Sequence, residues 1–120
     1  MGGGVRRARI CTALLGISLT VTVMAGCHES QPLSAAERGR RLYMANCITC
    51  HNPDPTQPGA SGPEIAGSSR ALIEARVLHA SYPPGYTPKR TTKAMHPLPY
   101  LVSAIDDLAA FLAAAQNAQH

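Results

Sequence analysis

The chain has 120 residues, and its composition and charge limit the kind of protein it can be. It carries 11 Lys and Arg against 7 Asp and Glu, and its aromatic residues are 4 Tyr and 1 Phe, with no Trp. Three of the basic residues lie within the first nine positions, so eight basic residues face seven acidic ones in the rest of the chain, a net charge of +1. A nearly neutral domain of this kind excludes nucleic-acid binding.

Residues 1–27 have the pattern of a secretory signal. Arg6, Arg7 and Arg9 form a basic region, and residues 10–25 form an apolar run that ends in small residues. This run is short for a membrane span and is interrupted by Thr and Ser, although an uncleaved anchor is the alternative. We therefore expect an exported protein.

The end of this segment, Met24-Ala25-Gly26-Cys27, resembles a bacterial lipobox, in which the cysteine becomes the acylated first residue of the mature protein. Met stands where the usual lipobox has Leu. Lipidation would account for an unpaired thiol in an oxidising compartment, and several acyl chains would anchor the protein stably. The alternative is ordinary cleavage nearby, which leaves Cys27 as a free thiol. The prediction is a periplasmic protein, lipid-anchored to the membrane, with residues 28–33 as a tether.

The folded domain is predicted at residues 34–115, with a frayed tail at 116–120. Its first helix begins with a capping box, in which Ser34 is the N-cap and Glu37 reaches back to it. Helical spacing places Tyr43 on the side of this helix that faces the core. The arginines that lie off this side are predicted to be solvated: Arg38, Arg40 and Arg41.

The first helix leads into Cys47-Ile48-Thr49-Cys50-His51, which is the attachment pattern of c-type haem. Each thiol adds to one haem vinyl group, and the histidine reaches the iron as its proximal ligand. Cysteines three positions apart on a helix share a face, so both sulfurs can meet one porphyrin edge. A zinc half-site lacks a second cysteine pair, a thioredoxin-like motif lacks a βαβ setting, and a disulfide would leave the histidine unexplained. The sequence thus predicts one covalent haem c.

A loop and a second helix are predicted after the motif. Residues 52–63 contain four prolines and two glycines, which leaves no room for regular structure. The second helix is predicted at residues 70–80, capped by Ser68 or Ser69, with His79 in its last turn near the negative end of the helix dipole. Its predicted apolar side consists of Ala71, Leu72, Ala75, Leu78 and Ala80.

A long irregular segment and a last helix complete the chain. Residues 81–99 are extended and rich in proline, and a segment of this length without regular structure needs a reason, such as wrapping a haem. The last helix is predicted to start with Ser103 as N-cap and Asp106 in the Glu position of a capping box. Its apolar stripe consists of Ile105, Leu108, Phe111 and Leu112.

Gly39, Tyr43 and the Cys47–His51 motif resemble the N-terminal helix and haem site of class I c-type cytochromes, and residues 105–112 resemble their C-terminal helix. The resemblance implies an all-α domain, with three to four helices wrapped around one covalently bound haem. It also implies that the glycine permits a close crossing by the C-terminal helix, where Phe111 meets the tyrosine.

The resemblance also implies the surroundings of the iron. Gly62-Pro63 is similar to the family's Gly-Pro, whose proline carbonyl accepts the Nδ1–H of the proximal histidine, here His51. Met95 is similar to the family's distal methionine, so His51 and Met95 are the implied iron ligands. His96, which follows it, stands where the family commonly has a small residue or proline. The alternatives for the sixth ligand are His96, His79 and Met44.

A six-coordinate iron has no free position for a substrate, so the resemblance implies a single-electron carrier and not an enzyme. The implied partners are redox proteins of the periplasm or membrane, such as an oxidase, a reductase or a dehydrogenase. Two alternatives stay open: a dedicated cytochrome subunit of a larger dehydrogenase or oxidase, and a haem sensor or enzyme with an open distal site. Three cations line the haem rim or belong to a solvated loop: Lys89, Arg90 and Lys93.

Overall fold

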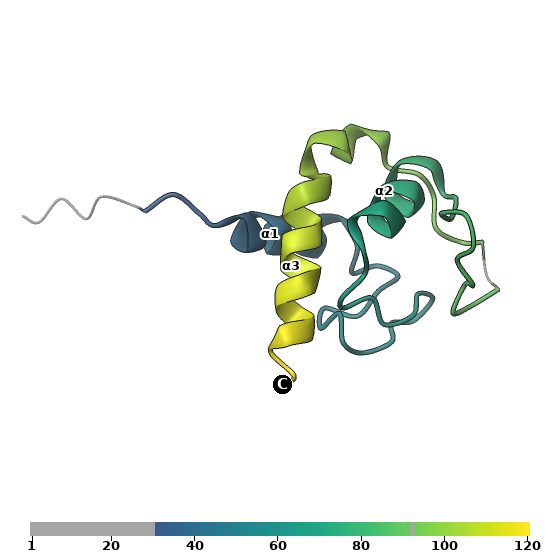
Figure 1. The fold of residues 1–120 in the computed structure, drawn as a ribbon, viewed down its shortest axis with the longest axis horizontal. Coiled ribbons are helices and arrows are strands. Elements are labelled where there is room, and N and C mark those ends of the chain that lie inside the picture. Colours follow the sequence, from purple (N-terminus) through teal and green to yellow (C-terminus); the bar gives the residue numbers. More distant parts are fainter. Residues whose placement is uncertain (1–30, 92) are drawn as a thin grey trace, which may run out of the picture. The chain divides into compact units, whose positions relative to one another are not determined.

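The computed structural model describes residues 31–91 and 93–120 (Figure 1). The helices in this part of the chain are α1 (Ala35–Asn46), α2 (Arg70–His79) and α3 (Ile105–Asn117), and a 3₁₀-helix, η1 (Pro99–Ala104), leads directly into α3. The described residues form no strand, so the predicted all-α class is confirmed. None of their helices is long and apolar enough to cross a membrane. The predicted signal, the lipobox and the start of the tether lie outside these residues.

The predicted capping box starts α1. Ser34 Oγ accepts a hydrogen bond from the Glu37 backbone N–H at 3.2 Å, and the Ser34 N–H donates to Glu37 Oε2 at 2.8 Å. Two of the N–H groups that a helix start leaves without partners are thereby satisfied. The helix ends at Asn46, and the N–H of Cys47 still donates to the Tyr43 carbonyl at 2.9 Å. The haem-attachment motif therefore follows directly after the last turn of α1.

The predicted crossing of the first and last helices is confirmed. A Cβ on Gly39 would lie 1.9 Å from the Asp107 carbonyl oxygen and 2.9 Å from Phe111 Cβ, so only glycine fits where α1 meets α3. The rings of Tyr43 and Phe111 are 5.2 Å apart and tilted by 49°. Tyr43 is 1 % exposed. Two backbones in such close contact fix the frame on which the haem motif is built.

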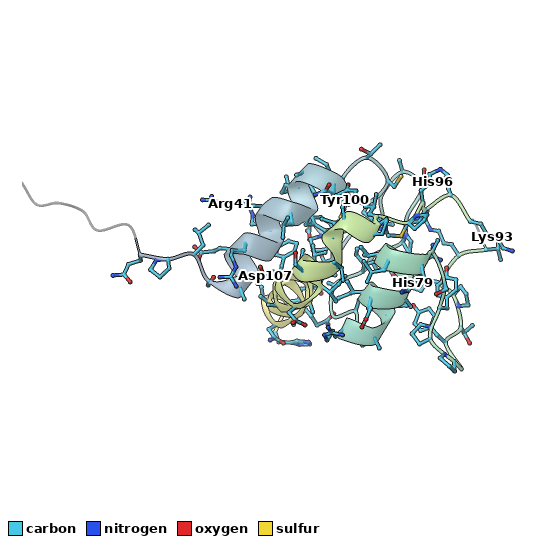
Figure 2. The ribbon with its side chains drawn as sticks, turned by 90° about the horizontal axis from the view of Figure 1, so that it is seen from above. Arg41, His79, Lys93, His96, Tyr100 and Asp107 are labelled. Carbon is cyan, nitrogen blue, oxygen red and sulfur yellow. The ribbon has the colours of Figure 1, made fainter. Side chains whose placement is uncertain are left out.

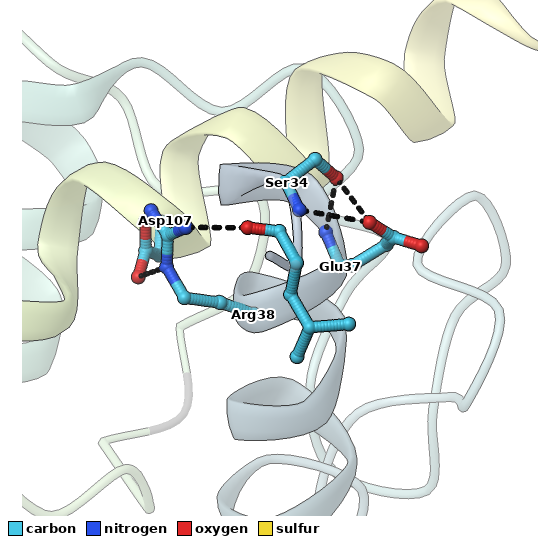
Figure 3. Close-up of polar contacts among 5 residues, drawn as sticks. Ser34, Glu37, Arg38 and Asp107 are labelled. Atoms are coloured by element: carbon cyan, nitrogen blue, oxygen red, sulfur yellow. Dashed lines mark hydrogen bonds and ion pairs between the residues drawn. The ribbon is translucent and has the colours of Figure 1, made fainter. Parts of the chain in front are cut away.

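Arg38 was predicted as part of a solvated helix side, and the structure corrects this. Its Nε and Nη2 donate to the two carboxylate oxygens of Asp107, at 2.9 Å and 2.6 Å, and its Nη1 donates to the Leu33 carbonyl at 2.7 Å. Figure 3 shows this fork beside the capping box. The guanidinium is half exposed yet ties α1 to the start of α3. Periodicity along one helix does not reveal an acidic partner on another helix.

The second helix begins and ends as predicted, but its predicted apolar side is incomplete, because it left out both buried residues. Ser69 is the N-cap, and its Oγ accepts from the Leu72 N–H at 3.2 Å. The buried residues of α2 are Ile73 and Val77, whereas Ala71 is exposed. α2 has apolar residues on more than one side because it packs against η1 and α3 and also lines a cavity. A single apolar stripe therefore could not be assigned from spacing.

The predicted N-cap of the last helix is also wrong. Ser103 lies inside η1, and α3 begins after Ala104 without a side-chain cap. Since η1 runs directly into α3, helical carbonyls already precede the first turn of α3 and no cap is required. The acidic residues of this turn pair with arginines instead: Asp107 with Arg38, and Asp106 with Arg70 at 2.6 Å. The helix continues to Asn117, into the predicted tail.

The helices share one small core. α3 packs against both α1 and α2, while α1 and α2 make at most marginal contact with each other in the described residues. The buried residues are Tyr43, Ile73, Val77, Leu101, Ala104, Ile105, Leu108 and Leu112. The space between the end of α1 and α2 is where the functional residues gather.

Candidate haem site

A cavity bounded by α1, α2, α3 and the segments that connect them has the size and chemistry of a cofactor site. Its volume is about 1000 Å³ when the part open to solvent is included. Its apolar wall consists mainly of Tyr43, Ile65, Leu72, Ile73, Leu108 and Leu112. An apolar wall of this extent suits the flat, largely apolar surface of a porphyrin.

Both cysteines of the motif line this cavity. The chain turns after α1, where the N–H groups of Cys50 and His51 donate to the Cys47 carbonyl at 3.2 Å and 2.9 Å. Cys47 and Cys50 are half-buried free thiols, so they form no disulfide with each other. Burial, and to a lesser degree the neighbouring Cys50, raises the pKa of Cys47 to about 11. Both sulfurs face the cavity from one wall, as attachment to one porphyrin edge requires.

His51 presents one ring nitrogen to the protein. Its Nδ1 lies 3.1 Å from the Pro63 carbonyl oxygen. A carbonyl can only accept, so Nδ1 carries the proton and Nε2 keeps a free lone pair. Burial lowers the pKa of His51, which favours the neutral ring, while the hydrogen bond to Pro63 acts in the opposite direction and Arg90 and Arg76 lower the pKa further. The predicted contact between Pro63 and His51 is confirmed.

Gly62 makes room for the His51 ring. A Cβ at this position would lie 2.4 Å from both the Cε1 and the Nδ1 of His51. Any larger residue would push the imidazole from its place or break the hydrogen bond to Pro63. The Gly-Pro pair therefore acts as a unit, in which the glycine lets the ring approach and the proline carbonyl orients it.

The four candidate sixth ligands occupy different surroundings. Met95 is half-buried, packs against the core and lines the cavity. His79 and His96 are exposed and are not part of the cavity wall (Figure 2). Met44 packs against the core outside the cavity. Of these four, the structure brings Met95 into one cavity with His51.

The contacts that polar side chains make at the cavity were not predicted from the sequence, although Lys89 and Arg90 themselves were named as residues of the haem rim or of a solvated loop. Arg76 lies with its Cζ 4.3 Å from the centre of the Tyr82 ring, which in turn stacks on Tyr86 at 5.4 Å. Lys89 Nζ donates to the carbonyl oxygen and to Oε1 of Glu64, at 2.9 Å and 3.0 Å. The only sequence signal for these residues was the unusual length of the irregular segment that follows α2. Of the three cations predicted at the rim or in a solvated loop, Lys89 and Arg90 line the cavity and Lys93 does not.

The described residues contain no cluster of three or more His, Cys, Asp or Glu side chains that could hold a metal ion by themselves. The functional groups of the cavity are instead two thiols, one imidazole with a free nitrogen, and one thioether, set in an apolar wall. These groups fit a haem c, which brings its own iron and needs from the protein two attachment thiols and axial ligands.

A helical fold, a CxxCH motif and an apolar cavity that both cysteines face define a c-type haem protein. Comparison of the sequence with protein families agrees, because the Cytochrome c model matches residues 36–116, more than half of the chain. The chain belongs to the cytochrome c family. Members of this family bind haem c covalently through cysteines, so the protein is a haem-binding electron carrier. Cys47 and Cys50 fit the role of the attachment residues. No curated protein and no solved structure gave a significant match.

Proposed function

We propose that the protein is a class I cytochrome c that carries single electrons with His51 and Met95 as the axial ligands of its iron. The observation that carries the proposal is that Met95 and the neutral His51 line the same cavity, while His79 and His96 lie outside its wall. A bound haem would supply a reversible one-electron iron couple. Two protein ligands leave no position for a substrate, which favours a carrier over an enzyme or a sensor.

Each residue near the iron has a separate task in this proposal. The Pro63 carbonyl holds the Nδ1–H of His51, which fixes the ring orientation and increases the basicity of the ligand nitrogen. The thioether of Met95 is a soft ligand that favours ferrous iron and raises the reduction potential. The apolar wall excludes water and favours the less charged, reduced site.

The optical spectrum of the ferric holoprotein tests the ligand set. Iron bound by methionine sulfur gives a weak long-wavelength charge-transfer band. Met95→Ala is expected to abolish this band and to let the ferrous protein bind carbon monoxide. Met44→Ala is the matched control, because Met44 packs against the core away from the cavity, and it is expected to keep the band. A band that survives in Met95→Ala and disappears in His96→Ala would refute the assignment.

We further propose that the protein is exported to the periplasm and anchored through lipid on Cys27, where its partners are redox proteins. The sequence features at residues 6–27 support this proposal. In the native host, Cys27→Ser is expected to move the holoprotein from the membrane fraction to the soluble fraction with its haem spectrum unchanged. A variant that stays with the membrane would argue for an uncleaved anchor.

A second candidate function is a cytochrome subunit that stays docked on a larger enzyme. Two apolar side chains on η1 favour it, since Tyr100 is 66 % and Val102 is 64 % exposed. The Tyr100 hydroxyl donates to Asn46 Oδ1 at 2.9 Å, which holds the ring at the end of α1. Size-exclusion chromatography after mild solubilisation distinguishes the two: a carrier elutes alone, whereas a subunit elutes with its enzyme and is released in Val102→Glu.

A further inference from the structure

The charged groups that line the cavity carry an excess of positive charge. In the described cavity wall, Arg76, Lys89 and Arg90 are cations and Glu64 is the sole carboxylate, which leaves a net charge of +2. The cavity is otherwise mostly apolar. Placing positive charge in an apolar pocket costs free energy unless an anionic group of the ligand or of the protein pairs with it.

The three cations differ in how far the protein already satisfies them. Lys89 is paired with Glu64 through both its carbonyl and its carboxylate oxygen. Arg76 uses Nη1 to donate to the Ala80 carbonyl at 2.7 Å, and its remaining N–H groups have no hydrogen-bond partner among the described residues. Arg90 makes no hydrogen bond to any described residue. The guanidinium groups of Arg76 and Arg90 thus keep N–H donors at the cavity wall that have no partner among the described residues.

These guanidinium groups lie on segments separate from the attachment cysteines. Cys47 and Cys50 follow α1, whereas Arg76 lies on α2 and Arg90 on the segment after it. α1 and α2 make at most marginal contact, so the cavity separates them. In a haem, the vinyl groups and the two propionates occupy opposite edges of the porphyrin. A porphyrin attached at the α1 side would therefore direct its propionates toward α2 and the segment that follows.

We infer that Arg76 and Arg90 bind the two propionate carboxylates of the haem. The inference rests on the proposed placement of the haem between His51 and Met95. Two carboxylates neutralise the net charge of +2 on the cavity wall, and a guanidinium presents parallel N–H donors that match a carboxylate.

The tyrosine pair holds Arg76 in position for this role. The Arg76 Cζ lies over the Tyr82 ring, 4.3 Å from its centre, and Tyr82 in turn stacks on Tyr86 with ring planes 10° apart. Stacking uses the face of a guanidinium and leaves the N–H groups at its edge free for a carboxylate.

Two readouts on the holoprotein test the inference: the resonance Raman propionate bending vibration, whose frequency follows the hydrogen bonding of the carboxylate, and the midpoint potential. Arg90→Gln and Arg76→Gln are each expected to shift the vibration. Each should also lower the midpoint potential, by up to about tenfold in the reduction equilibrium or about 59 mV, because a cation near the iron favours the ferrous state. Arg90→Lys should restore most of the potential but not the vibration, since lysine lacks the parallel donors.

Lys93→Gln is the matched control, because Lys93 is an exposed cation three residues from Arg90 that does not line the cavity. It is expected to leave the vibration unchanged. The inference is overturned if neither arginine variant shifts the vibration, or if Lys93→Gln shifts it as much. Should Arg76→Gln yield no holoprotein, Arg90→Gln decides alone. The ferric charge-transfer band is recorded in every variant, so that a failure of the methionine ligation is told apart from a failure of this inference.

Discussion

The wall of the cavity that carries His51 is held by backbone hydrogen bonds, whereas the wall that carries Met95 is held chiefly by side chains. On the His51 side, the N–H groups of Ser61 and Gly62 both donate to the Cys50 carbonyl, at 3.1 Å and 2.9 Å. A second pair of bonds, from Ile65 and Ala66 to the Pro55 carbonyl, closes the same loop. The position of the imidazole is therefore set by the local chain.

On the Met95 side, no backbone hydrogen bond joins any described residue from 87 to 97 to another part of the chain. The contacts that hold this segment are the pair between Lys89 and Glu64 and the packing of Met95 against the core. Segments with few backbone bonds are the ones that open most easily. We therefore expect the attachment side to impose its geometry on a bound haem, and the other side to take much of its order from it. Changes on the first side should therefore be all-or-none, and changes on the second should be graded.

The largest difference is expected for covalent attachment. The double variant Cys47→Ser, Cys50→Ser removes both thioether-forming sulfurs and should abolish haem stain on a denaturing gel. Met95→Ala removes one axial ligand and should keep the stain in full. Haem that stays with the double-serine chain after denaturation would show that attachment does not run through this pair.

An intermediate difference is expected for two glycines. Gly62→Ala places a Cβ 2.4 Å from the His51 ring, and it should lower the free energy of unfolding by about 3 kcal/mol because the ring must shift. Gly85→Ala, on the other side, meets nothing within 4 Å but has a φ of 77°, and it should cost only about 1 kcal/mol of backbone strain. Denaturant unfolding of both holoproteins measures the two values. Equal losses would contradict the comparison.

The smallest effect is expected for Glu64→Gln, which weakens the pair with Lys89. The hydrogen bond from Lys89 holds the pKa of Glu64 below its usual 4.5, so the stability it contributes is present above that pH and is lost as the pH falls through the lowered pKa. The wild-type protein should be slightly more stable than the variant at neutral pH, and the difference should vanish in acid. A difference that grows in acid would reverse the sign and refute the role of the pair.

The parts of the fold that could be predicted from the sequence are those set by near neighbours or by a tight motif. The capping box of Ser34 spans three residues, and Gly39 and Phe111 belong to a crossing that admits little variation. The buried face of α2 could not be predicted, because two of its sides meet apolar surroundings. The missing cap at Ser103 follows from η1, which precedes it and removes the need for one.

The site divides in the same way. The CxxCH motif could be predicted from its spacing, and the role of Gly62-Pro63 from the resemblance to class I cytochromes, where the chain returns to His51 within a short loop. The stack of Arg76 on Tyr82 depends on how the chain leaves α2, where Ala80 adopts a left-handed conformation with φ of 50°. The pair between Lys89 and Glu64 joins residues 25 positions apart. Neither contact has a sequence signature of its own, because each arises from the path of an irregular segment.

That path begins and ends at almost the same place. The N–H of Ser81 donates to the Ala75 carbonyl, and the N–H of Leu98 donates to the Val77 carbonyl, so both ends of the segment are fastened to one turn of α2. The described residues between these two bonds thus belong to a loop of the Ω type, whose ends lie close together. Doubling the length of such a loop costs only about 0.6 kcal/mol of closure entropy. Lengthening the loop that bears Met95 should therefore change the stability of the helices and of the attachment motif very little.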